Sequence, residues 1–301
     1  MPTTIRPSHS SAAVAGLAAL LAVTLAACAP EDDTGGTTPG VSGSADPSDG
    51  GDCGPENLET LEEGMLTIAT DQPAYEPWMV EDDPTNGQGF EAAVAYAVAG
   101  QLGYADDAVT WTRVPFNAAI QPGPKEFDFD INQFTINARR AKAVDFSSPY
   151  YTASQAVVTT GTSTAATATS IADLKGLRIG AQVATTSLDA VTEVIAPTGG
   201  PAVFNTNDDA KLALENGQVD AIVVDLPTAF FITSAELTDG KIVGQLADTG
   251  SGGDEFGLLL DKDSPLTECV SSAVDALTKD GTLADLEAEW LADVASAPVL
   301  E

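Results

Sequence analysis

Three of the chain's 12 lysine and arginine residues fall together in one short stretch, although Asp and Glu number 45. Arg139, Arg140 and Lys142 follow a run, 127–136, that reads as a strand, and they precede an aromatic and polar segment. A guanidinium just beyond a strand end can hold a carboxylate through two parallel, charge-assisted hydrogen bonds. We therefore interpret Arg140 as the anchor for a small anionic or zwitterionic ligand, with a solvated basic turn as the alternative.

The remaining reactive side chains exclude several kinds of chemistry. The only histidine is His9, in the N-terminal leader, and the sequence has no Cys-x-x-Cys pair and no Asp-x-Asp-x-Asp-Gly calcium loop. Without histidine, the mature chain lacks most acid–base, triad and zinc chemistry. The net charge of −33 argues against nucleic acid and anionic lipid headgroups as partners. We expect no catalytic residue, no metal and no cofactor.

The N-terminus predicts export. Residues 11–27 form a run of small and apolar residues, ending in Leu-Ala-Ala before Cys28, so we expect 1–27 to be a signal peptide. Leu-Ala-Ala-Cys resembles the bacterial lipobox, which implies cleavage before Cys28 and lipidation of its sulfur; an ordinary signal peptide is the alternative. Residues 28–55 are mostly Gly, Ser, Thr, Pro, Asp and Glu, which predicts a disordered tether. We expect a protein anchored by lipid to the outer face of the cell membrane.

Two cysteines are left once Cys28 carries lipid: Cys53 and Cys269. An exported compartment is oxidising, and two cysteines make one pair. We predict a Cys53–Cys269 disulfide between the start of the folded region and a C-terminal helix, with two buried thiols as the alternative.

Strand-like and helix-like segments alternate along the rest of the chain, which predicts mostly parallel sheets covered by helices. Two chain crossings, near residues 151–155 and 247–256, predict a hinge and a cleft between two α/β lobes. We expect a first lobe in 56–152, a second lobe in 153–250, and a return of 251–301 to the first lobe with C-terminal helices. The expected strands are 65–70, 109–114, 127–136, 154–159, 177–181, 202–205, 219–224 and 256–260, and the expected helices are 90–102, 185–195, 208–215, 226–235, 266–277 and 283–291.

One long motif resembles a known family. Residues 134–150 read Phe-Thr-Ile-Asn-Ala-Arg-Arg-Ala-Lys-Ala-Val-Asp-Phe-Ser-Ser-Pro-Tyr, and shorter motifs follow at 173–180, 217–221 and 280–283. Together they resemble the extracytoplasmic solute-binding proteins of polar amino acid ABC transporters, family 3. The resemblance implies a two-lobed, type II periplasmic-binding-protein-like α/β fold with a hinge of two crossings, a membrane permease as partner, and a monomer.

The resemblance also implies ligand-binding roles at matching positions. Arg140 and Thr135 match residues that hold the ligand's α-carboxylate, and Thr185 and Thr186 match a helix start that closes on it. Asp225 matches the aspartate that receives the ligand's α-ammonium; its alternative role is a helix cap. A zwitterion in a closed cleft requires one fixed cation and one fixed anion, as Arg140 and Asp225 would supply.

Other matching positions bear on the ligand's side chain. Asp71 matches a residue near it, and Tyr75 and Phe116 match aromatic walls around it, with core packing as the alternative for both aromatics. Gln133 replaces a small residue of the family pattern, and Gln182 stands where some members have lysine. A carboxylate between aromatic walls suits an amide or a cation, so glutamine or a basic amino acid is favoured over glutamate.

The resemblance implies a receptor that binds a polar amino acid by hinge closure and delivers it to an ABC transporter permease, without turnover. One alternative is an enzyme similar to cyclohexadienyl dehydratases, with a cleft carboxylate such as Asp130 as general acid. Another alternative is a tethered sensor module. Arg139, where glutamate is usual, and Asn137, in place of threonine, leave the ligand specificity open.

Overall fold

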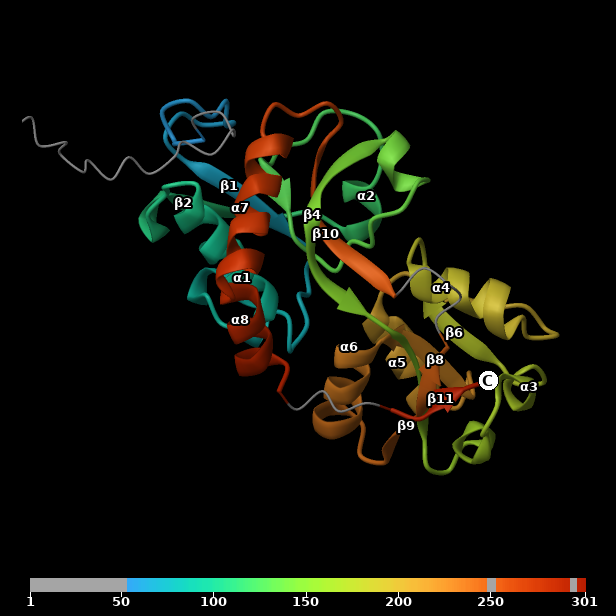
Figure 1. Ribbon diagram of the computed structural model, residues 1–301. Helices are drawn as coiled ribbons and strands as arrows, with labels where there is room; N and C mark the ends of the chain where they lie inside the picture. The colour runs from blue at the N-terminus through green and yellow to red at the C-terminus, as the bar shows by residue number, and fades with distance from the viewer. Residues whose placement is uncertain (1–52, 248–252, 293–296) are drawn as a thin grey trace, which may run out of the picture. The chain divides into compact units, whose positions relative to one another are not determined.

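The computed structural model describes residues 53–247, 253–292 and 297–301. The predicted signal peptide, the predicted lipidation site Cys28 and most of the predicted tether lie outside these ranges. None of the described helices is long and apolar enough to cross a membrane. The folded region contains two α/β lobes, each built around one sheet (Figure 1).

The first lobe is built on a five-stranded mixed sheet. Its strands are β1 (Leu66–Thr70), β2 (Val109–Arg113), β3 (Phe129–Asp130), β4 (Val144–Ala153) and β10 (Asp254–Asp261). They lie in the order β2-β1-β3-β10-β4. β1 is parallel to β2 and β3, whereas β10 is antiparallel to β3 and β4. β10 therefore returns to this sheet after the chain has passed through the second lobe.

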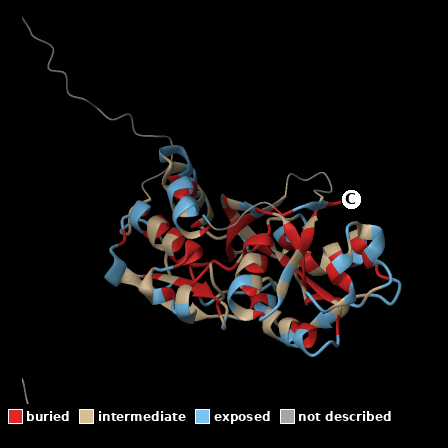
Figure 2. Cartoon of the chain, turned by 90° about the horizontal axis from the view of Figure 1, so that it is seen from below, coloured by how far each residue is buried: buried red, intermediate tan, exposed pale blue. Residues whose placement is uncertain are grey.

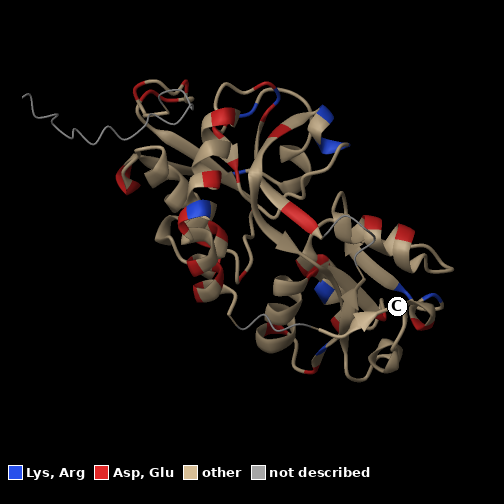
Figure 3. Ribbon diagram, viewed as in Figure 1, with Lys and Arg blue, Asp and Glu red and all other residues tan. Residues whose placement is uncertain are grey.

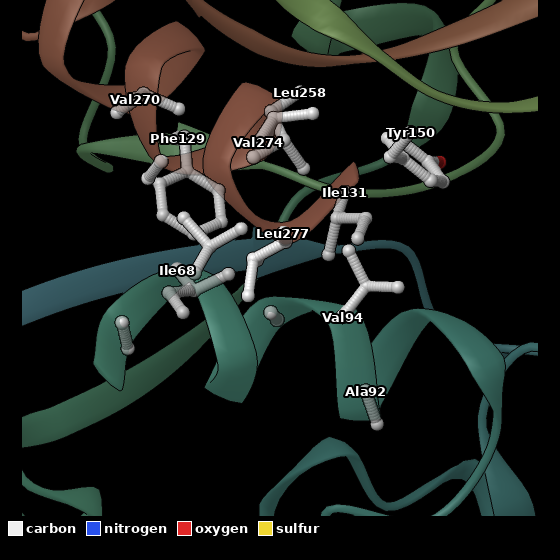
Figure 4. Close-up of a cluster of buried hydrophobic side chains, with 14 of the residues drawn as sticks. Ile68, Ala92, Val94, Phe129, Ile131, Tyr150, Leu258, Val270, Val274 and Leu277 are labelled. Carbon is white, nitrogen blue, oxygen red and sulfur yellow. The ribbon is translucent and has the colours of Figure 1, made fainter. Parts of the chain in front are cut away.

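Alternating residues of these strands pack on opposite faces of the first sheet, as the two-residue period of a strand requires. Leu258 and Leu260 join a large core cluster, whereas Leu259 joins a smaller cluster on the other face. Three helices that lie side by side in Figure 1 cover the large cluster: α1 (Phe90–Gln101), α7 (Thr267–Asp280) and α8 (Thr282–Trp290). Figure 4 shows side chains of the sheet, α1 and α7 meeting in this core, among them Ile68, Phe129, Val94, Val274 and Leu277.

The second lobe is built on a six-stranded mixed sheet. Its strands are β5 (Gln155–Thr160), β6 (Ile179–Gln182), β7 (Ala202–Phe204), β8 (Ala221–Asp225), β9 (Gly240–Leu246) and β11 (Val299–Leu300). The order is β11-β9-β5-β8-β6-β7. β6 is parallel to β7 and β8, and β11 to β9, whereas β5 is antiparallel to β8 and β9.

Both faces of the second sheet are buried. Val158 and Val224 pack against α5 (Asn207–Glu215) and α6 (Leu226–Phe231) on one face. The opposite face, with Val157 and Val223, packs against the short helices α3 and α4 and a π-helical turn, η6. These three are α3 (Ile171–Leu174), α4 (Thr186–Ala190) and η6 (Val191–Ile195). Figure 2 shows the resulting run of buried residues along the strands.

The remaining short helical elements connect the strands. They are η1 (Val80–Asp82), η2 (Pro84–Asn86), η3 (Asp106–Ala108), α2 (Phe116–Ala119), η4 (Arg140–Lys142), η5 (Thr164–Thr167) and η7 (Ile232–Glu236).

The expected strand 127–136 is much shorter, because only Phe129–Asp130 pairs within the sheet. The chain turns at Gln133, whose φ is 46°, and Thr135 then makes a single bridge to Phe256. A left-handed residue cannot continue a strand. Conversely, β4 was not predicted as a strand, yet it is the longest one in the described residues and pairs with β10.

Each sheet is mostly parallel, as predicted, because its described strands run in one direction with a single exception. The exceptions are β10 in the first sheet and β5 in the second, which run against their neighbours. The helix expected at 185–195 begins as predicted, with Thr185 as N-cap accepting a hydrogen bond from the Leu188 N–H (3.1 Å). It changes to the π-helical turn η6 after Ala190. The helix expected at 226–235 divides in the same way into α6 and η7.

The C-terminal boundary also differs from the expectation. β10, α7 and α8 return to the first lobe, but β11 pairs with β9 in the second sheet. Judged from the described strands and helices, the chain therefore passes between the lobes three times rather than twice. Gly244 permits this pairing, because a Cβ there would lie 2.5 Å from the Pro298 carbonyl oxygen.

The predicted disulfide is confirmed. Cys53 is bonded to Cys269, which joins the segment before β1 to α7 across a sequence separation of 216 residues. Both cysteines pack against the large core cluster of the first lobe.

Candidate functional site

A small cavity lies between the two lobes. Its volume is about 30 Å³, which is room for one or two water molecules. Most of its lining follows the carboxyl ends of strands, where open α/β sheets bind ligands. The first lobe contributes Asp71, Tyr75, Phe116, Asn132, Gln133 and Arg140. The second lobe contributes Gln182, Thr185, Thr186, Ser187, Asn207, Val224 and Asp225.

Arg140 lies at the start of η4 and is 4% exposed. The Asn137 side chain accepts a hydrogen bond from the Arg140 N–H (2.9 Å), which fixes the backbone there. The Arg140 guanidinium donates through Nη1 to the Thr135 carbonyl (2.8 Å) and through Nη2 to the Ala184 carbonyl (2.9 Å). Its Nε has no hydrogen-bond partner among the described residues. Arg140 is therefore a placed, buried cation and not a solvated basic turn.

The surroundings of Arg140 leave it charged. Burial, with the nearby Arg139, lowers the pKa of Arg140 to about 10, so the guanidinium stays protonated at neutral pH. It lies 5.3 Å from the centroid of the Phe116 ring, a distance at which an aromatic face attracts a cation. Figure 3 marks the Lys and Arg positions on the ribbon in blue and the more numerous Asp and Glu positions in red.

Asp225 ends β8 and occupies the N-cap position of α6, but its side chain makes no capping hydrogen bond. The alternative role of Asp225 as a helix cap is therefore not supported. Its Oδ1 instead accepts from the side-chain amide of Gln155 (2.7 Å). Burial, the neighbouring Asp254 and Glu91 raise the pKa of Asp225 to about 7, although Gln155 and Arg140 act in the opposite direction.

Several contacts join the two lobes around the cavity. The Arg140 bond to the Ala184 carbonyl crosses from the first lobe to the second, and Thr135 Oγ1 lies 3.2 Å from Thr186 Oγ1. The Arg139 guanidinium pairs with Asp189 of α4 (2.9 Å). The buried Trp78 indole donates to Thr228 Oγ1 of α6 (2.8 Å). The lobes are therefore joined by several separate contacts.

Another part of the cavity wall is formed by one acidic side chain, Asp71, and two aromatic side chains, Tyr75 and Phe116. The Asp71 carboxylate accepts from the backbone N–H groups of Gln72 (2.6 Å) and Phe116 (3.1 Å), and burial raises its pKa. The Phe116 ring stacks on Phe134 at 4.8 Å between centroids. Tyr75 is partly buried on the cavity wall.

Gln133 is held by a residue that the sequence did not reveal, Glu91 of α1. Glu91 is fully buried, and its Oε1 accepts from the Gln133 N–H (2.7 Å). Its carboxylate also accepts from the Gln133 side-chain amide and from the Tyr150 hydroxyl. The Gln133 side chain is thus bonded back to the first lobe. Burial raises the pKa of Glu91 to about 7.

The structure brings most of the predicted site residues together. Nine of the ten line this cavity: Asp71, Tyr75, Phe116, Gln133, Arg140, Gln182, Thr185, Thr186 and Asp225. The tenth, Thr135, lines a neighbouring cavity that also contacts Thr186. The sequence prediction missed Asn132, Ser187, Asn207 and Val224, as well as Glu91 behind the wall. Glu91 had one signal, a carboxylate in the first turn of an otherwise apolar, Ala-rich helix.

Asp130 does not belong to the cavity. Both of its carboxylate oxygens are buried without a hydrogen-bond partner among the described residues, and burial raises its pKa well above the usual range. It is not among the side chains that line the cavity, so it is poorly placed to act as a general acid on a bound ligand. Within the described ranges, no group of three or more His, Cys, Asp or Glu side chains is arranged to hold a metal ion.

Comparison with known proteins identifies relatives of the chain. The family model of the bacterial extracellular solute-binding proteins, family 3, matches residues 66–293. The L-arginine-binding protein of Pseudomonas aeruginosa is 27% identical over 241 residues, which cover 75% of this chain and 90% of that protein. The L-cystine-binding protein TcyJ of Escherichia coli K12 is 30% identical over 240 residues, which cover 77% of this chain and 85% of that protein.

A solved structure shows the same fold. An ancestral arginine-binding protein bound to glutamine superposes with a TM-score of 0.63 and 30% identity, and the match covers 76% of this chain and 98% of that one. The two-lobed, type II fold expected from the sequence is thereby confirmed.

Proposed function

The chain belongs to family 3 of the bacterial extracellular solute-binding proteins, and on that basis we propose that it is the receptor of a polar amino acid ABC transporter. It binds the amino acid between its lobes, outside the cytoplasm, and delivers it to a membrane permease. The observation that carries the proposal is the position of Arg140 in one lobe and Asp225 in the other, on the wall of one cavity.

The two charges of an amino acid match these two side chains. The ligand's α-carboxylate would accept from the Arg140 guanidinium, because a guanidinium can donate two parallel hydrogen bonds to a carboxylate. The Nε of Arg140 has no partner among the described residues. Its α-ammonium would donate to Asp225, of which only Oδ1 is bonded to Gln155. A buried charge is unfavourable unless it is paired. The ligand's carboxylate and ammonium would pair with Arg140 and Asp225, and so would stabilise the closed state of the lobes.

Ligand entry requires the lobes to move apart. An amino acid is larger than the one or two water molecules that fit in about 30 Å³. In this structure Arg140 Nη2 donates to the Ala184 carbonyl of the second lobe. A carboxylate oxygen of the ligand would take the place of that carbonyl as the acceptor. Separation and closure about the strand crossings would exchange that carbonyl for the ligand, because binding favours the state with more contacts to it.

The charge of the lining favours a basic amino acid, with glutamine as the next choice. A ligand ammonium beside Asp225 favours the ionised form of that carboxyl, so a bound amino acid would face two negative side chains, Asp71 and Asp225, and one positive side chain, Arg140, a net charge of −1. A ligand of net charge +1 neutralises this charge. The two relatives described above are named for arginine and cystine, and the ancestral arginine-binding protein was solved with glutamine. Proteins with this fold therefore accept ligands with a basic side chain and ligands with an amide side chain.

Retention near the permease would come from the N-terminus. Cys28 lies in a sequence that resembles a lipobox, and the residues between it and the folded region have the composition of a flexible tether. Two or more acyl chains give stable membrane anchoring. A lipidated, monomeric receptor would remain close to the permease while its folded region turns freely.

A thermal-shift screen with the twenty amino acids, ornithine and citrulline tests the proposal, because binding to the folded state raises the melting temperature. We expect the largest shift with a basic amino acid. Arg140→Ala should then weaken binding in calorimetry by about 30-fold or more, since truncation leaves the ligand carboxylate unpaired. Its circular dichroism should match that of the wild type.

Two outcomes would overturn the proposal. The first is a wild-type protein that binds no amino acid. The second is equal affinity of the wild type and Arg140→Ala. Incubation with prephenate or arogenate provides a control for turnover, and we expect no product.

A further inference from the structure

Gln155 lies where the chain enters the second lobe, and both the nitrogen and the oxygen of its side-chain amide are hydrogen-bonded. It is the first residue of β5, is 8% exposed, and lies opposite Asp225 of β8 in the sheet. Its Oε1 accepts from the Ser187 hydroxyl (2.7 Å). Its Nε2 donates to Asp225 Oδ1 (2.7 Å) and to Asp254 Oδ2 (2.7 Å).

The direction of the Gln155 amide follows from its partners. The Ser187 hydroxyl donates to the amide oxygen, so the NH₂ end must face the two carboxylates. The two short bonds from the amide nitrogen go to carboxylate oxygens, and such charge-assisted bonds are the stronger kind; a longer contact reaches Thr186 Oγ1 (3.4 Å). Among the described residues the Asp225 carboxylate makes no other hydrogen bond, so Gln155 fixes its orientation.

The same amide spans the two lobes. Asp225 belongs to the second sheet, whereas Asp254 is the first residue of β10 in the first sheet. Gln155 itself follows the first crossing and Asp254 follows the second. One side chain therefore connects the proposed ammonium-binding carboxylate with the strand that leads back to the first lobe.

We propose that Gln155 is a positioning residue of the amino acid site: it orients Asp225 for the ligand's α-ammonium and couples that carboxylate, through Asp254, to the crossings about which the lobes close. This inference rests on the proposed function. Gln155 does not line the cavity, so it acts through Asp225 and not by touching the ligand.

The coupling has an electrostatic cause. Asp225 and Asp254 are like charges held on one NH₂ group, and Asp254 opposes the ionisation of Asp225. Glu91 opposes it too, whereas Arg140 favours it. An ammonium on Asp225 would offset the repulsion between the two carboxylates. The closed arrangement at the crossings would then be favoured most when an α-ammonium is present.

The test compares Gln155→Met, which keeps the chain length without hydrogen bonds, with the wild type in calorimetry. The probes are L-arginine and its deaminated counterpart 5-guanidinopentanoate, with L-glutamine and 4-carbamoylbutanoate as a second pair. We expect Gln155→Met to reduce the preference for the amino acid over its deaminated counterpart by about tenfold, the size of one lost hydrogen bond to a charged group. Gln245→Met is the matched control, because that glutamine bonds the Ala297 carbonyl, away from the cavity.

A pH profile separates positioning from a general effect on folding. Gln155→Glu adds a carboxyl beside Asp225, so the acid limit of L-arginine affinity should move to higher pH. Asp254→Asn removes a carboxylate, so that limit should move to lower pH. The charged groups facing Asp225 in this comparison are Asp254, Glu91 and Arg140, and the last two stay unchanged.

The outcomes distinguish the proposed function from the positioning role of Gln155. If the wild type binds neither L-arginine nor L-glutamine, the proposed function fails and the inference fails with it. If the wild type binds but Gln155→Met keeps the full preference for the amino acid, the inference alone is overturned. It is also overturned if Gln155→Glu and Asp254→Asn change affinity equally at every pH, since a structural role alone would produce that result.

Discussion

Asp225 is the residue whose protonation should control both stability and ligand binding. Its carboxyl has a usual pKa of 3.8, and burial with the neighbouring Asp254 raises it to about 7 in the folded protein. The unfolded chain releases this proton near pH 4, whereas the folded protein keeps it until about pH 7. Asp225 therefore contributes stability at low pH that is lost as the pH rises from about 4 to about 7.

Ligand binding should have the opposite pH dependence. An α-ammonium requires the ionised form of Asp225, so the gain in melting temperature on adding L-arginine should be larger at pH 7.5 than at pH 5. Melting curves with and without L-arginine across this range measure both effects. Asp225→Asn is the control, because subtracting its curve removes the contribution of the other carboxylates. A ligand-induced shift with the same pH dependence in both proteins would contradict the assignment of Asp225.

Glu91 should act on the site through the backbone of Gln133. A left-handed non-glycine residue is unfavourable, and Glu91 holds it by accepting from both the N–H and the side-chain amide of Gln133. Gln133 is two residues before Thr135, whose carbonyl accepts from Arg140 (2.8 Å). Loss of the Glu91 contact should therefore disturb the segment that positions the guanidinium.

A double-mutant cycle tests this dependence by calorimetry. Glu91→Gln should lower the affinity for L-arginine by about tenfold in the wild-type background, because charge-assisted bonds to Gln133 are lost. In the Gln133→Gly background the same change should have little effect, since glycine adopts a positive φ without support. Equal losses in the two backgrounds would show that Glu91 does not act through Gln133.

At the scale of elements, the sequence predicts well wherever one periodic pattern governs a segment. The apolar runs of β1, β5 and β8 and the helical pattern of α1 and α7 are found within a few residues of their predicted bounds. The predictions fail where a tertiary contact overrides the local pattern. Gln133 ends the expected strand because Glu91 of another element holds it, and β11 joins the second sheet because Gly244 leaves room for it.

The residues of the candidate site also divide into those that local sequence indicates and those that only long-range contacts bring together. Arg140 and Asp225 could be proposed as site residues because the motif around Arg140 and the position of Asp225 at the end of a strand are local features of the sequence. The partners Gln155, Asp254 and Glu91 could not, because their contacts span 70, 99 and 42 residues of sequence. Their side chains are ordinary for a strand start or a helix, and only the fold brings them into contact with residues of the cavity wall.

The disulfide should contribute to the stability of the first lobe without contributing to ligand binding. It joins the segment before β1 to α7 across 216 residues, away from the cavity lining. Replacing both cysteines, Cys53→Ser with Cys269→Ser, should lower the free energy of unfolding by about 3–5 kcal/mol, because a long loop is no longer closed in the unfolded chain. Melting curves measure the loss, and calorimetry should give an unchanged affinity for L-arginine.

Reductant supplies the control for the disulfide. It should lower the melting temperature of the wild type and leave the double variant unaffected. A double variant that melts with the wild type under oxidising conditions would rule out a stabilising role for this bond.

At the scale of the whole folded region, the contacts between the lobes determine how easily the cavity opens. The bond from Trp78 to Thr228 is buried and the bond from Arg140 to Ala184 is partly buried, whereas the pair between Arg139 and Asp189 is exposed. Each of them exists only while the lobes are together. Any change in such a contact alters the balance between open and closed states and so alters ligand affinity, even though the ligand does not touch it.

The Arg139–Asp189 pair should therefore tune affinity in a salt-dependent way. Its side chains are 65% and 43% exposed, so the pair is worth only about 0.2–1 kcal/mol, and Arg139→Glu adds a repulsion of similar size. We expect Arg139→Glu to weaken L-arginine binding by about two- to fivefold at low salt and by less in 1 M NaCl, where surface charges are screened. Calorimetry at the two salt concentrations measures the change.

Charge exchange and a matched control decide whether the effect comes from lobe closure. Adding Asp189→Arg to Arg139→Glu restores opposite charges across the lobes and should restore the affinity. Arg178→Glu disrupts an exposed pair with Asp220 (2.7 Å) inside the second lobe, so it should lower stability without a salt-dependent change in affinity. If Arg178→Glu and Arg139→Glu weaken binding alike, or if the exchanged pair fails to recover it, the Arg139–Asp189 contact does not contribute to holding the lobes closed.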